Sequence, residues 1–153
     1  KIITFISERS IPCAKSIDYV AATIALKQAQ KQGAIEAVYV DRKGHVLEGT
    51  TSNIFALIDG KLITPGTGIL SGITRKAVLN LAVKKLSVDI RDLERDELSS
   101  ADEVFITGTN KMIVPVVQVD HSPIGDGRPG QVTHTLMQAL IKEIDDYYEK
   151  QNE

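Results

Sequence analysis

One lysine stands in a position that favours amine chemistry. Lys15 follows Pro12-Cys13-Ala14 and precedes a stretch of helical periodicity, so we expect it at the first turn of a helix. The positive end of a helix dipole disfavours a neighbouring ammonium and so favours the free amine that Schiff-base formation requires. A solvated lysine near a helix start is the simpler interpretation, and composition alone favours it.

Two loop segments have the composition of an anion site. Residues 68–75 include Gly72-Ile73-Thr74, which opens a predicted helix whose free N–H groups attract a phosphate or carboxylate. Residues 107–111 include Gly108-Thr109, where backbone amides can form a concave nest beside a hydroxyl. Ordinary helix and strand ends explain each segment taken singly, because neither the P-loop pattern nor GxGxxG is present.

A third polar segment, residues 48–53, begins with a carboxylate. Glu48 ends a predicted strand, and no basic residue near it in the sequence pairs with it. The histidines His45, His121 and His134 lack the spacing of metal ligands, so no metal site is predicted. Cys13 has no neighbouring base and is interpreted as a packing residue rather than a nucleophile.

Strands and helices must position these residues, and the hydrophobic periodicity of the sequence predicts where the strands and helices lie. Hairpins join neighbouring strands, with Asp59-Gly60 as one tight turn, and Pro115 restricts its strand to an edge or a bulge. We therefore expect an α+β fold with antiparallel or mixed sheets. The predicted strands are 1–6, 35–40, 45–48, 53–58, 61–64, 88–92, 104–107 and 112–119; the predicted helices are 17–32, 74–85 and 132–148, with 93–101 partly helical.

Each of the three predicted helices carries a stripe at helical spacing, which is typical of a helix packed on a core. The stripe of the second helix is Ala77, Val78, Leu81, Ala82 and Leu86. The first helix ends before Gly33, a residue suited to a left-handed C-terminal cap. Its stripe is Ile17, Val20, Ala21, Ile24 and Gln28, and that of the last helix is Leu136, Met137, Leu140, Ile141, Ile144 and Tyr148.

The composition is that of a globular domain. The chain has 153 residues, 42% of them hydrophobic, and a net charge of -2, which excludes disorder and fibrous repeats. The absence of a Lys/Arg cluster argues against nucleic acid, and apolar runs such as Ile113–Val117 are too short to cross a membrane. One cysteine and no signal peptide favour the cytoplasm. The missing initiator Met suggests that the chain starts partway through a longer protein.

Four motifs occur in a fixed order along the chain. They are AKSIDY at 14–19, EA...D..G.V.EG..SNIF at 36–55, GIL.GITR at 68–75, and ADEVF.TGT at 101–109 followed by PV at 115–116. Together they resemble the class IV aminotransferases, the fold-type IV pyridoxal-phosphate enzymes. This group includes branched-chain and D-amino acid aminotransferases and aminodeoxychorismate lyase. The resemblance covers nearly the whole chain.

The resemblance implies a pyridoxal 5'-phosphate (PLP) site. Lys15 would form the Schiff base with the cofactor and move the substrate's α-proton. Glu48 would face the pyridine nitrogen and keep it protonated, so that the ring can accept electrons. The backbone amides of Ile73 and Thr74 would hold the phosphate, together with the hydroxyl and amide of Thr109.

The resemblance also implies the remaining site residues. Leu70 would pack on the ring face, and Tyr19 would lie near the phenolic oxygen of the cofactor. Asn110 and Lys111 would lie in the turn near the substrate carboxylate. That turn is bulkier and more charged than in the branched-chain enzymes, and Asp18 stands where the family often has Asn, so the substrate class stays open.

The family's domain organisation gives further expectations. The fold would have antiparallel or mixed sheets forming a barrel-like core packed by three main helices. Residues 1–13 would be the end of an interdomain linker and the first strand, and residues 14–153 the cofactor-binding C-terminal domain. The N-terminal small domain, which supplies an arginine to the phosphate and much of the substrate pocket, is absent from this chain. A homodimer is expected by analogy.

The leading hypothesis is an aminotransferase that moves an amino group between a branched-chain or D-amino acid and a 2-oxo acid. One alternative is β-elimination of the aminodeoxychorismate lyase type, which begins with the same proton abstraction. Another is a non-catalytic fragment that keeps the fold and binds a phosphate ligand or only a partner. The joint presence of Lys15, Glu48 and Thr109 favours an enzyme, although the isolated domain can be inactive because half of its pocket wall is missing.

Overall fold

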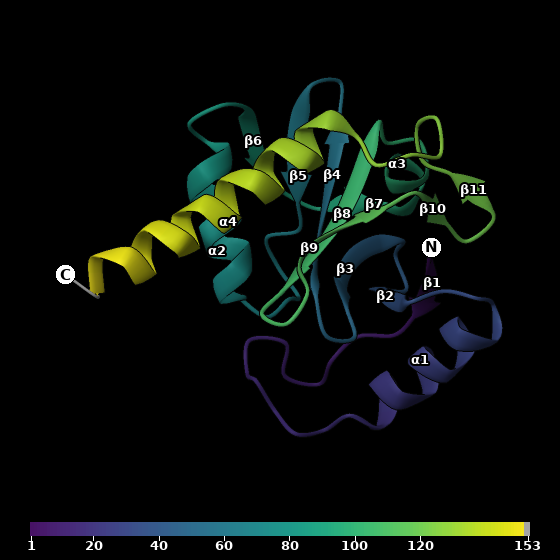
Figure 1. Ribbon diagram of the computed structural model, residues 1–153. Coiled ribbons are helices and arrows are strands. Elements are labelled where there is room, and N and C mark those ends of the chain that lie inside the picture. The colour runs from purple at the N-terminus through teal and green to yellow at the C-terminus, as the bar shows by residue number, and fades with distance from the viewer. Residues whose placement is uncertain (152–153) are drawn as a thin grey trace.

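The computed structural model describes residues 1–151, which form two mixed β-sheets facing each other across one apolar core (Figure 1). The six-stranded sheet has the order β11-β10-β1-β2-β3-β7, and the five-stranded sheet has the order β6-β5-β4-β8-β9. The strands are β1 (Ile2–Ile6), β2 (Glu36–Val40), β3 (His45–Gly49), β4 (Asn53–Ile58), β5 (Lys61–Thr64), β6 (Ser87–Ile90), β7 (Leu93–Glu94), β8 (Glu103–Gly108), β9 (Met112–Val116), β10 (Gln118–Val119) and β11 (Ser122–Pro123). The helices are α1 (Val20–Lys31), α2 (Ile73–Ala82), α3 (Arg95–Ser99) and α4 (Gln131–Gln151).

The core between the sheets explains the apolar composition of the central strands. Ile2 and Val38 of the six-stranded sheet meet Ile54 and Ile106 of the five-stranded sheet, and all four are fully buried. β1 and β2 pair in parallel, and helix α1 covers their outer face. Strands covered on both faces read as continuous apolar runs, as β2 does apart from Glu36.

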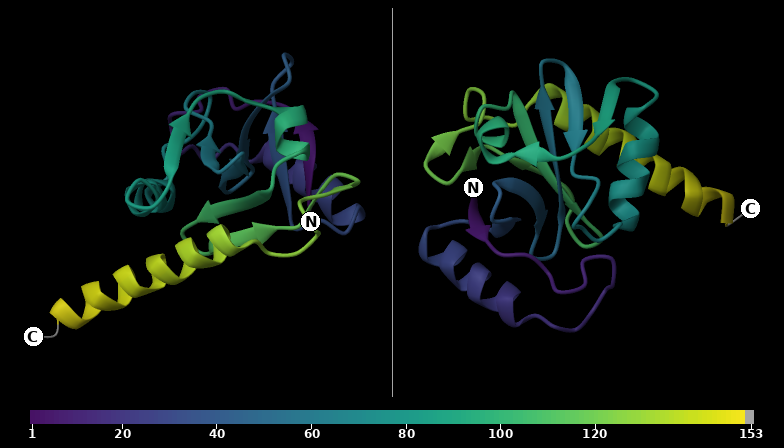
Figure 2. Two further views of the ribbon diagram at one scale, coloured as in Figure 1. Left: turned by 90° about the horizontal axis from the view of Figure 1, so that it is seen from above. Right: turned by 180° about the vertical axis from the view of Figure 1, so that it is seen from behind.

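Helices α2 and α4 cover the outer face of the five-stranded sheet. Phe55 and Phe105 stack across β4 and β8 with ring centroids 4.8 Å apart, and both helices pack around them. The C-terminal half of α4 extends beyond the sheets (Figure 2). The expected α+β class with mixed sheets and a barrel-like core is confirmed, with three long helices and the short α3. Within residues 1–151, no helix is both long and apolar enough to span a membrane.

The hairpin of β4 and β5 is confirmed with the predicted ends. Asp59 and Gly60 have φ values of 49° and 74°, in the left-handed region that a two-residue hairpin turn requires. The predicted cap at Gly33 is also confirmed. Its φ is 68°, and the amides of Gly33 and Ala34 donate to the carbonyls of Gln30 and Ala29, so the last carbonyls of α1 are satisfied.

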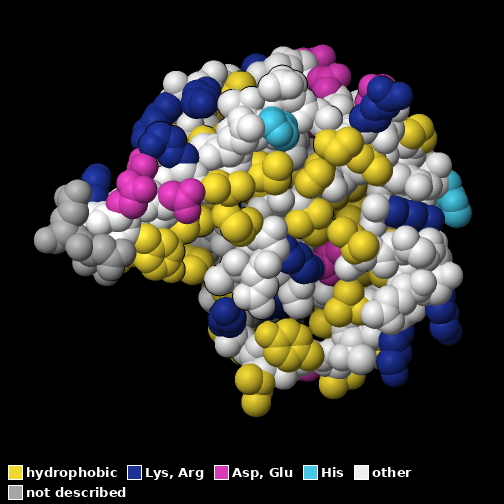
Figure 3. Space-filling model, in the orientation of Figure 1, with side chains coloured by type: hydrophobic (Ala, Val, Ile, Leu, Met, Phe, Trp, Pro, Cys, Tyr) yellow, Lys and Arg dark blue, Asp and Glu magenta, His cyan; other side chains and the backbone are white. Residues whose placement is uncertain are grey.

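The predicted start and apolar face of the first helix are wrong. The helix begins at Val20 rather than Ile17, and its buried face consists of Ala22, Ala25 and Ala29. Ile17 and Val20 are 94% and 70% exposed, and Figure 3 shows hydrophobic side chains protruding along the lower edge of the molecule, where the loop before α1 lies. Alanines permit a closer approach to the sheet than isoleucines, so the smaller side chains form the contact.

The prediction of one continuous strand over residues 112–119 is wrong. It divides into β9 and β10, which belong to different sheets. Pro115 lies on β9, the edge strand of its sheet, where a residue without an N–H is tolerated. Residue 117 carries the chain from one sheet to the other.

The apolar stripe predicted for the last helix is buried only in part. Leu136 and Leu140 are buried, whereas Ile144 and Tyr148 are exposed, since the helix continues past the sheet.

Glu103 of β8 caps the start of α4, because its carboxylate accepts the amides at residues 132 and 133 at 2.9 and 2.8 Å.

Candidate active site

A cavity of about 580 Å³ opens where the chain passes from one sheet to the other. β3 ends the passage through the six-stranded sheet at Gly49, and β4 starts the five-stranded sheet at Asn53. We call residues 50–52, which join these strands, the corner. The corner, the β8–β9 turn (residues 109–111), the start of α2 and the loop of residues 7–19 line the cavity.

The cavity brings together all nine predicted site residues. They come from four separate stretches of sequence, which the fold brings to one place. The nine are Lys15, Tyr19, Glu48, Leu70, Ile73, Thr74, Thr109, Asn110 and Lys111.

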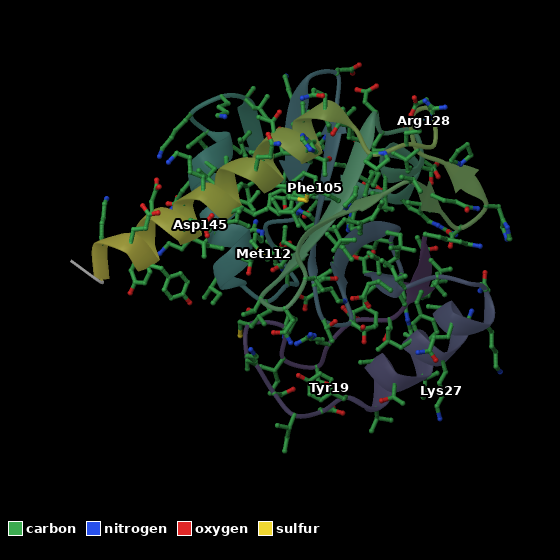
Figure 4. The ribbon with its side chains drawn as sticks, viewed as in Figure 1. Tyr19, Lys27, Phe105, Met112, Arg128 and Asp145 are labelled. Atoms are coloured by element: carbon green, nitrogen blue, oxygen red, sulfur yellow. The ribbon has the colours of Figure 1, made fainter. Side chains whose placement is uncertain are left out.

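Lys15 lies on the loop that precedes α1. Because the helix begins at Val20, the expected place of Lys15 on the first helical turn is wrong. The residue is exposed, and it borders the cavity from the loop side. Figure 4 shows Tyr19 on the same loop, below Met112 at the lower end of β9. Asp18 is exposed, and its carboxylate accepts the Val20 amide at 3.4 Å.

Glu48 is buried and incompletely hydrogen-bonded. Its Oε2 atom accepts the Leu70 amide at 3.0 Å and the Asn53 side-chain amide at 3.4 Å. Its Oε1 atom lies 3.1 Å from Arg9 Nε, but no donor among residues 1–151 makes a hydrogen bond to it. Burial raises the pKa of Glu48 above its usual value, although the Leu70 amide and the Arg9 charge oppose that rise.

Arg9 is a site residue that sequence reasoning missed. Its guanidinium pairs with Glu48 and donates from Nη2 to the Thr50 carbonyl oxygen at 3.1 Å. The loop of residues 7–19 therefore contacts the corner through one side chain. Nothing local to Arg9 in the sequence signals this contact, because its partners lie on a distant hairpin.

The start of α2 has the free amides expected of an anion site. No side chain caps the helix, and its first turn carries no acidic residue. Asn53 donates to the Leu70 carbonyl oxygen at 2.8 Å, which ties the segment before α2 to β4. A Cβ at Gly72 would collide with Asn53 Oδ1, so glycine permits this close approach. Gly72, Ile73 and Thr74 line the cavity at this helix start, where uncapped N–H groups favour an anion.

A second buried carboxylate, Glu36 of β2, was quoted in a motif but given no role. It accepts hydrogen bonds from the hydroxyls of all three corner residues, Thr50, Thr51 and Ser52. Lys111 Nζ lies 2.6 Å from Glu36 Oε2. Burial alone raises the pKa of Glu36, but these hydrogen bonds and the Lys111 charge outweigh it and hold the pKa below its usual value.

The donor set fits the group that the resemblance implies. Glu48 Oε1 is a buried acceptor without a hydrogen-bond donor, and a protonated ring nitrogen supplies one. The α2 amides suit an anionic tail, and Lys15 supplies an amine at the same cavity. The cavity can therefore hold a small aromatic cation that carries a phosphate.

The comparison with known families agrees with this geometry. Residues 4–119 match the family described as amino-transferase class IV. The chain belongs to this family. The branched-chain-amino-acid aminotransferase of Pseudomonas aeruginosa is 42% identical over 125 residues, which are 80% of this chain and 41% of that protein.

Solved structures are similar over nearly the whole chain. The branched-chain amino acid aminotransferase of Thermobaculum terrenum, in its PLP form, has a TM-score of 0.88 and 33% identity, covering 94% of this chain and 50% of that one. A Legionella pneumophila protein, provisionally described as a 4-amino-4-deoxychorismate lyase, has a TM-score of 0.86 and 29% identity, covering 93% and 55%. The chain thus spans about half the length of the relatives it matches.

Proposed function

We propose that this chain forms the cofactor-binding part of a PLP-dependent aminotransferase, which moves an amino group between an amino acid and a 2-oxo acid. One observation carries the proposal: Lys15 and Glu48, far apart in the sequence, border the same cavity, and Glu48 keeps an acceptor without a donor. Membership of the class IV family supports it. When bound, the cofactor supplies an electron sink for the breaking Cα–H bond.

Each charged group has a distinct task in this proposal. The amine of Lys15 holds the cofactor covalently and, once free, moves the proton at the substrate's α-carbon. Glu48 would hold the protonated ring nitrogen through Oε1, and the Arg9 charge favours the ionised form of the carboxylate against the effect of burial. The amides of Ile73 and Thr74 hold the phosphate, with the hydroxyl and amide of Thr109.

The remaining cavity residues orient the two ligands. Leu70 packs on the ring face, and Tyr19 contributes its hydroxyl at the ring's phenolic oxygen. The turn that contains Asn110 and Lys111 receives the substrate carboxylate. These four side chains all border the cavity, which is the geometric support for their roles.

A branched-chain amino acid is the substrate class that the relatives favour. Proteins named branched-chain-amino-acid aminotransferase are 39% to 43% identical to this chain. The likeness to the structure provisionally described as a lyase supports β-elimination as a second candidate, and D-amino acids are a further substrate class of the group. Pyruvate release from aminodeoxychorismate, measured against transamination dependent on 2-oxoglutarate, separates the two reactions.

We further propose that surfaces outside this chain complete the site. Residues 14–153 are the cofactor-binding domain, residues 1–13 are the end of an interdomain linker and the first strand, and an N-terminal small domain closes the pocket. A homodimer in the cytoplasm is the proposed assembly. The apolar side chains Ile17, Val20 and Ile24 are exposed, which supports a covering partner.

The test is the absorption spectrum of the chain mixed with PLP. Lys15→Ala is expected to abolish the absorption band of the lysine-bound cofactor. In the wild type, borohydride reduction should attach PLP permanently to Lys15 and raise the mass of the chain, and this increase should also be lost in the variant. Lys27→Ala, which removes an exposed lysine of α1, serves as the matched control. An unchanged spectrum and an unchanged labelling site in Lys15→Ala would rule out the assignment.

A further inference from the structure

The corner and the β8–β9 turn, two walls of the cavity, are connected through one buried carboxylate. Lys111 Nζ lies 2.6 Å from Glu36 Oε2 and donates to Thr51 Oγ1 at 3.0 Å. Thr51 belongs to the corner, whereas Lys111 belongs to the turn between β8 and β9. The lysine side chain therefore reaches out of its own turn and into the opposite wall.

Glu36 depends on this lysine for charge compensation. The carboxylate is 0% exposed, and the hydroxyl donors of Thr50 and Ser52 satisfy its oxygens without neutralising its charge. Within the part of the chain that the structure describes, Lys111 is the cation that pairs with it. Removing one partner of a buried ion pair leaves an uncompensated charge, so the pair resists separation.

The backbone is built for the same contact. A Cβ at Gly108 would lie 3.2 Å from the Thr51 carbonyl oxygen, so glycine lets the two walls approach closely. The Lys111 amide donates to the Gly108 carbonyl oxygen at 3.1 Å and closes the turn. Lys111 is thus held at its backbone by its own turn and at its ammonium by the corner.

We propose that Lys111 is a positioning residue: through Glu36 it fixes the β8–β9 turn against the corner, and its ammonium does not itself bind the substrate. Two of its three N–H donors already have partners, and its charge is already compensated by Glu36, so little charge is left for a substrate carboxylate. The reference to a substrate rests on the proposed function, whereas the coupling of the two walls does not.

Amide hydrogen exchange of the 153-residue chain without cofactor tests the coupling. Lys111→Met is expected to accelerate exchange about tenfold or more in residues 49–52 and 108–112, because both walls lose their common anchor. Lys111→Arg keeps the ion pair and is expected to stay within about threefold of the wild type. Lys43→Met removes an exposed lysine of another turn and serves as the matched control.

A kinetic measurement in the PLP-loaded enzyme separates positioning from direct binding. Lys111→Met is expected to raise KM for the amino acid about tenfold with kcat within about threefold, at every ionic strength. Unchanged exchange in Lys111→Met overturns the proposal, as does a KM effect that high salt abolishes while exchange stays at the wild-type rate. If the wild-type chain does not bind PLP, the proposed function fails and the exchange result still decides the coupling.

A double variant keeps the test decisive if Lys111→Met does not fold. Glu36→Gln with Lys111→Met removes both charges, so no uncompensated charge stays buried. Accelerated exchange at both walls in this variant supports the coupling, and wild-type exchange rates overturn it.

Discussion

Two buried carboxylates on the neighbouring strands β2 and β3 have opposite surroundings. Glu36 meets hydroxyls, a backbone amide and an ammonium, whereas Glu48 keeps one oxygen without a hydrogen-bond donor. Burial raises the pKa of both groups, and only around Glu36 do the donors reverse that rise. Burial alone therefore does not distinguish the two carboxylates; the acceptor atom of Glu48 that lacks a hydrogen-bond donor does.

The largest expected effect is on kcat, and it distinguishes Glu48 from Glu36. Glu48→Gln keeps the shape of the side chain and removes the charge that we propose pairs with the ring nitrogen, so kcat for the proposed transamination should fall about a hundredfold to a thousandfold. Stability against urea should fall less than in Glu36→Gln, because the loss of the Arg9 ion pair is offset by removal of an incompletely satisfied buried charge. Glu143→Gln on the exposed side of α4 is the control. A kcat within about twofold of wild type in Glu48→Gln would contradict the comparison.

The second effect is on the free energy of unfolding, and it distinguishes Glu36 from Glu48. Glu36→Gln leaves Lys111 without its ionic partner and disturbs the corner hydroxyls, so the free energy of unfolding should fall by about 3 kcal/mol. Urea unfolding measures the loss. A loss below about 1 kcal/mol would show that the donors around Glu36 rearrange freely and that the site is less rigid than its geometry indicates.

A smaller effect is expected within the corner itself. Ser52 is buried and donates to Glu36 at 3.0 Å, whereas Thr51 is exposed and donates at 3.2 Å. Ser52→Ala should cost about 1 kcal/mol of unfolding free energy, and Thr51→Val about 0.5 kcal/mol or less, because water can replace an exposed partner. Equal losses in the two variants, measured by urea unfolding, would argue against burial as the deciding factor.

The smallest effect is a difference in the pH dependence of stability. The folded-state pKa of Glu36 is below 4.5, so its contribution is present above pH 4.5 and is lost as pH falls toward the folded value. The folded-state pKa of Glu48 is above 4.5, so its protonated form stabilises at low pH and stability is lost as pH rises through that value. Unfolding curves at several pH values should show a shallower acid loss in Glu36→Gln and a shallower loss above pH 4.5 in Glu48→Gln. Parallel curves for both variants would refute the assigned directions.

Local patterns were sufficient to predict much of the fold. The turn between β4 and β5 could be predicted because Asp59 and Gly60 are chemically suited to left-handed conformations within a two-residue loop. The exposed stripe of α1 could not be predicted, because helical periodicity identifies apolar positions without showing which of them approach a neighbour. In α1, three alanines make the approach and leave Ile24 outside.

The site shows the same division between local and distant signals. Lys15 and Glu48 stand within motifs, so their types and neighbours suggested chemistry, and their assigned roles stay predictions. Arg9 and Glu36 act through partners on other elements, which a single sequence does not pair. Lys111 was predicted to lie in the turn near the substrate carboxylate. Its contact with Glu36 could not be predicted, because only the folded chain brings the two side chains together.

Because the corner connects the two sheets, the shape of the cavity depends on how the sheets are placed relative to each other. Because residues 50–52 belong to neither sheet and are held by both, any slippage of one layer against the other must distort this wall first. Loss of ligand binding should therefore precede loss of secondary structure on gentle heating. The temperature limit of ligand binding is then set by the corner and not by the two sheets.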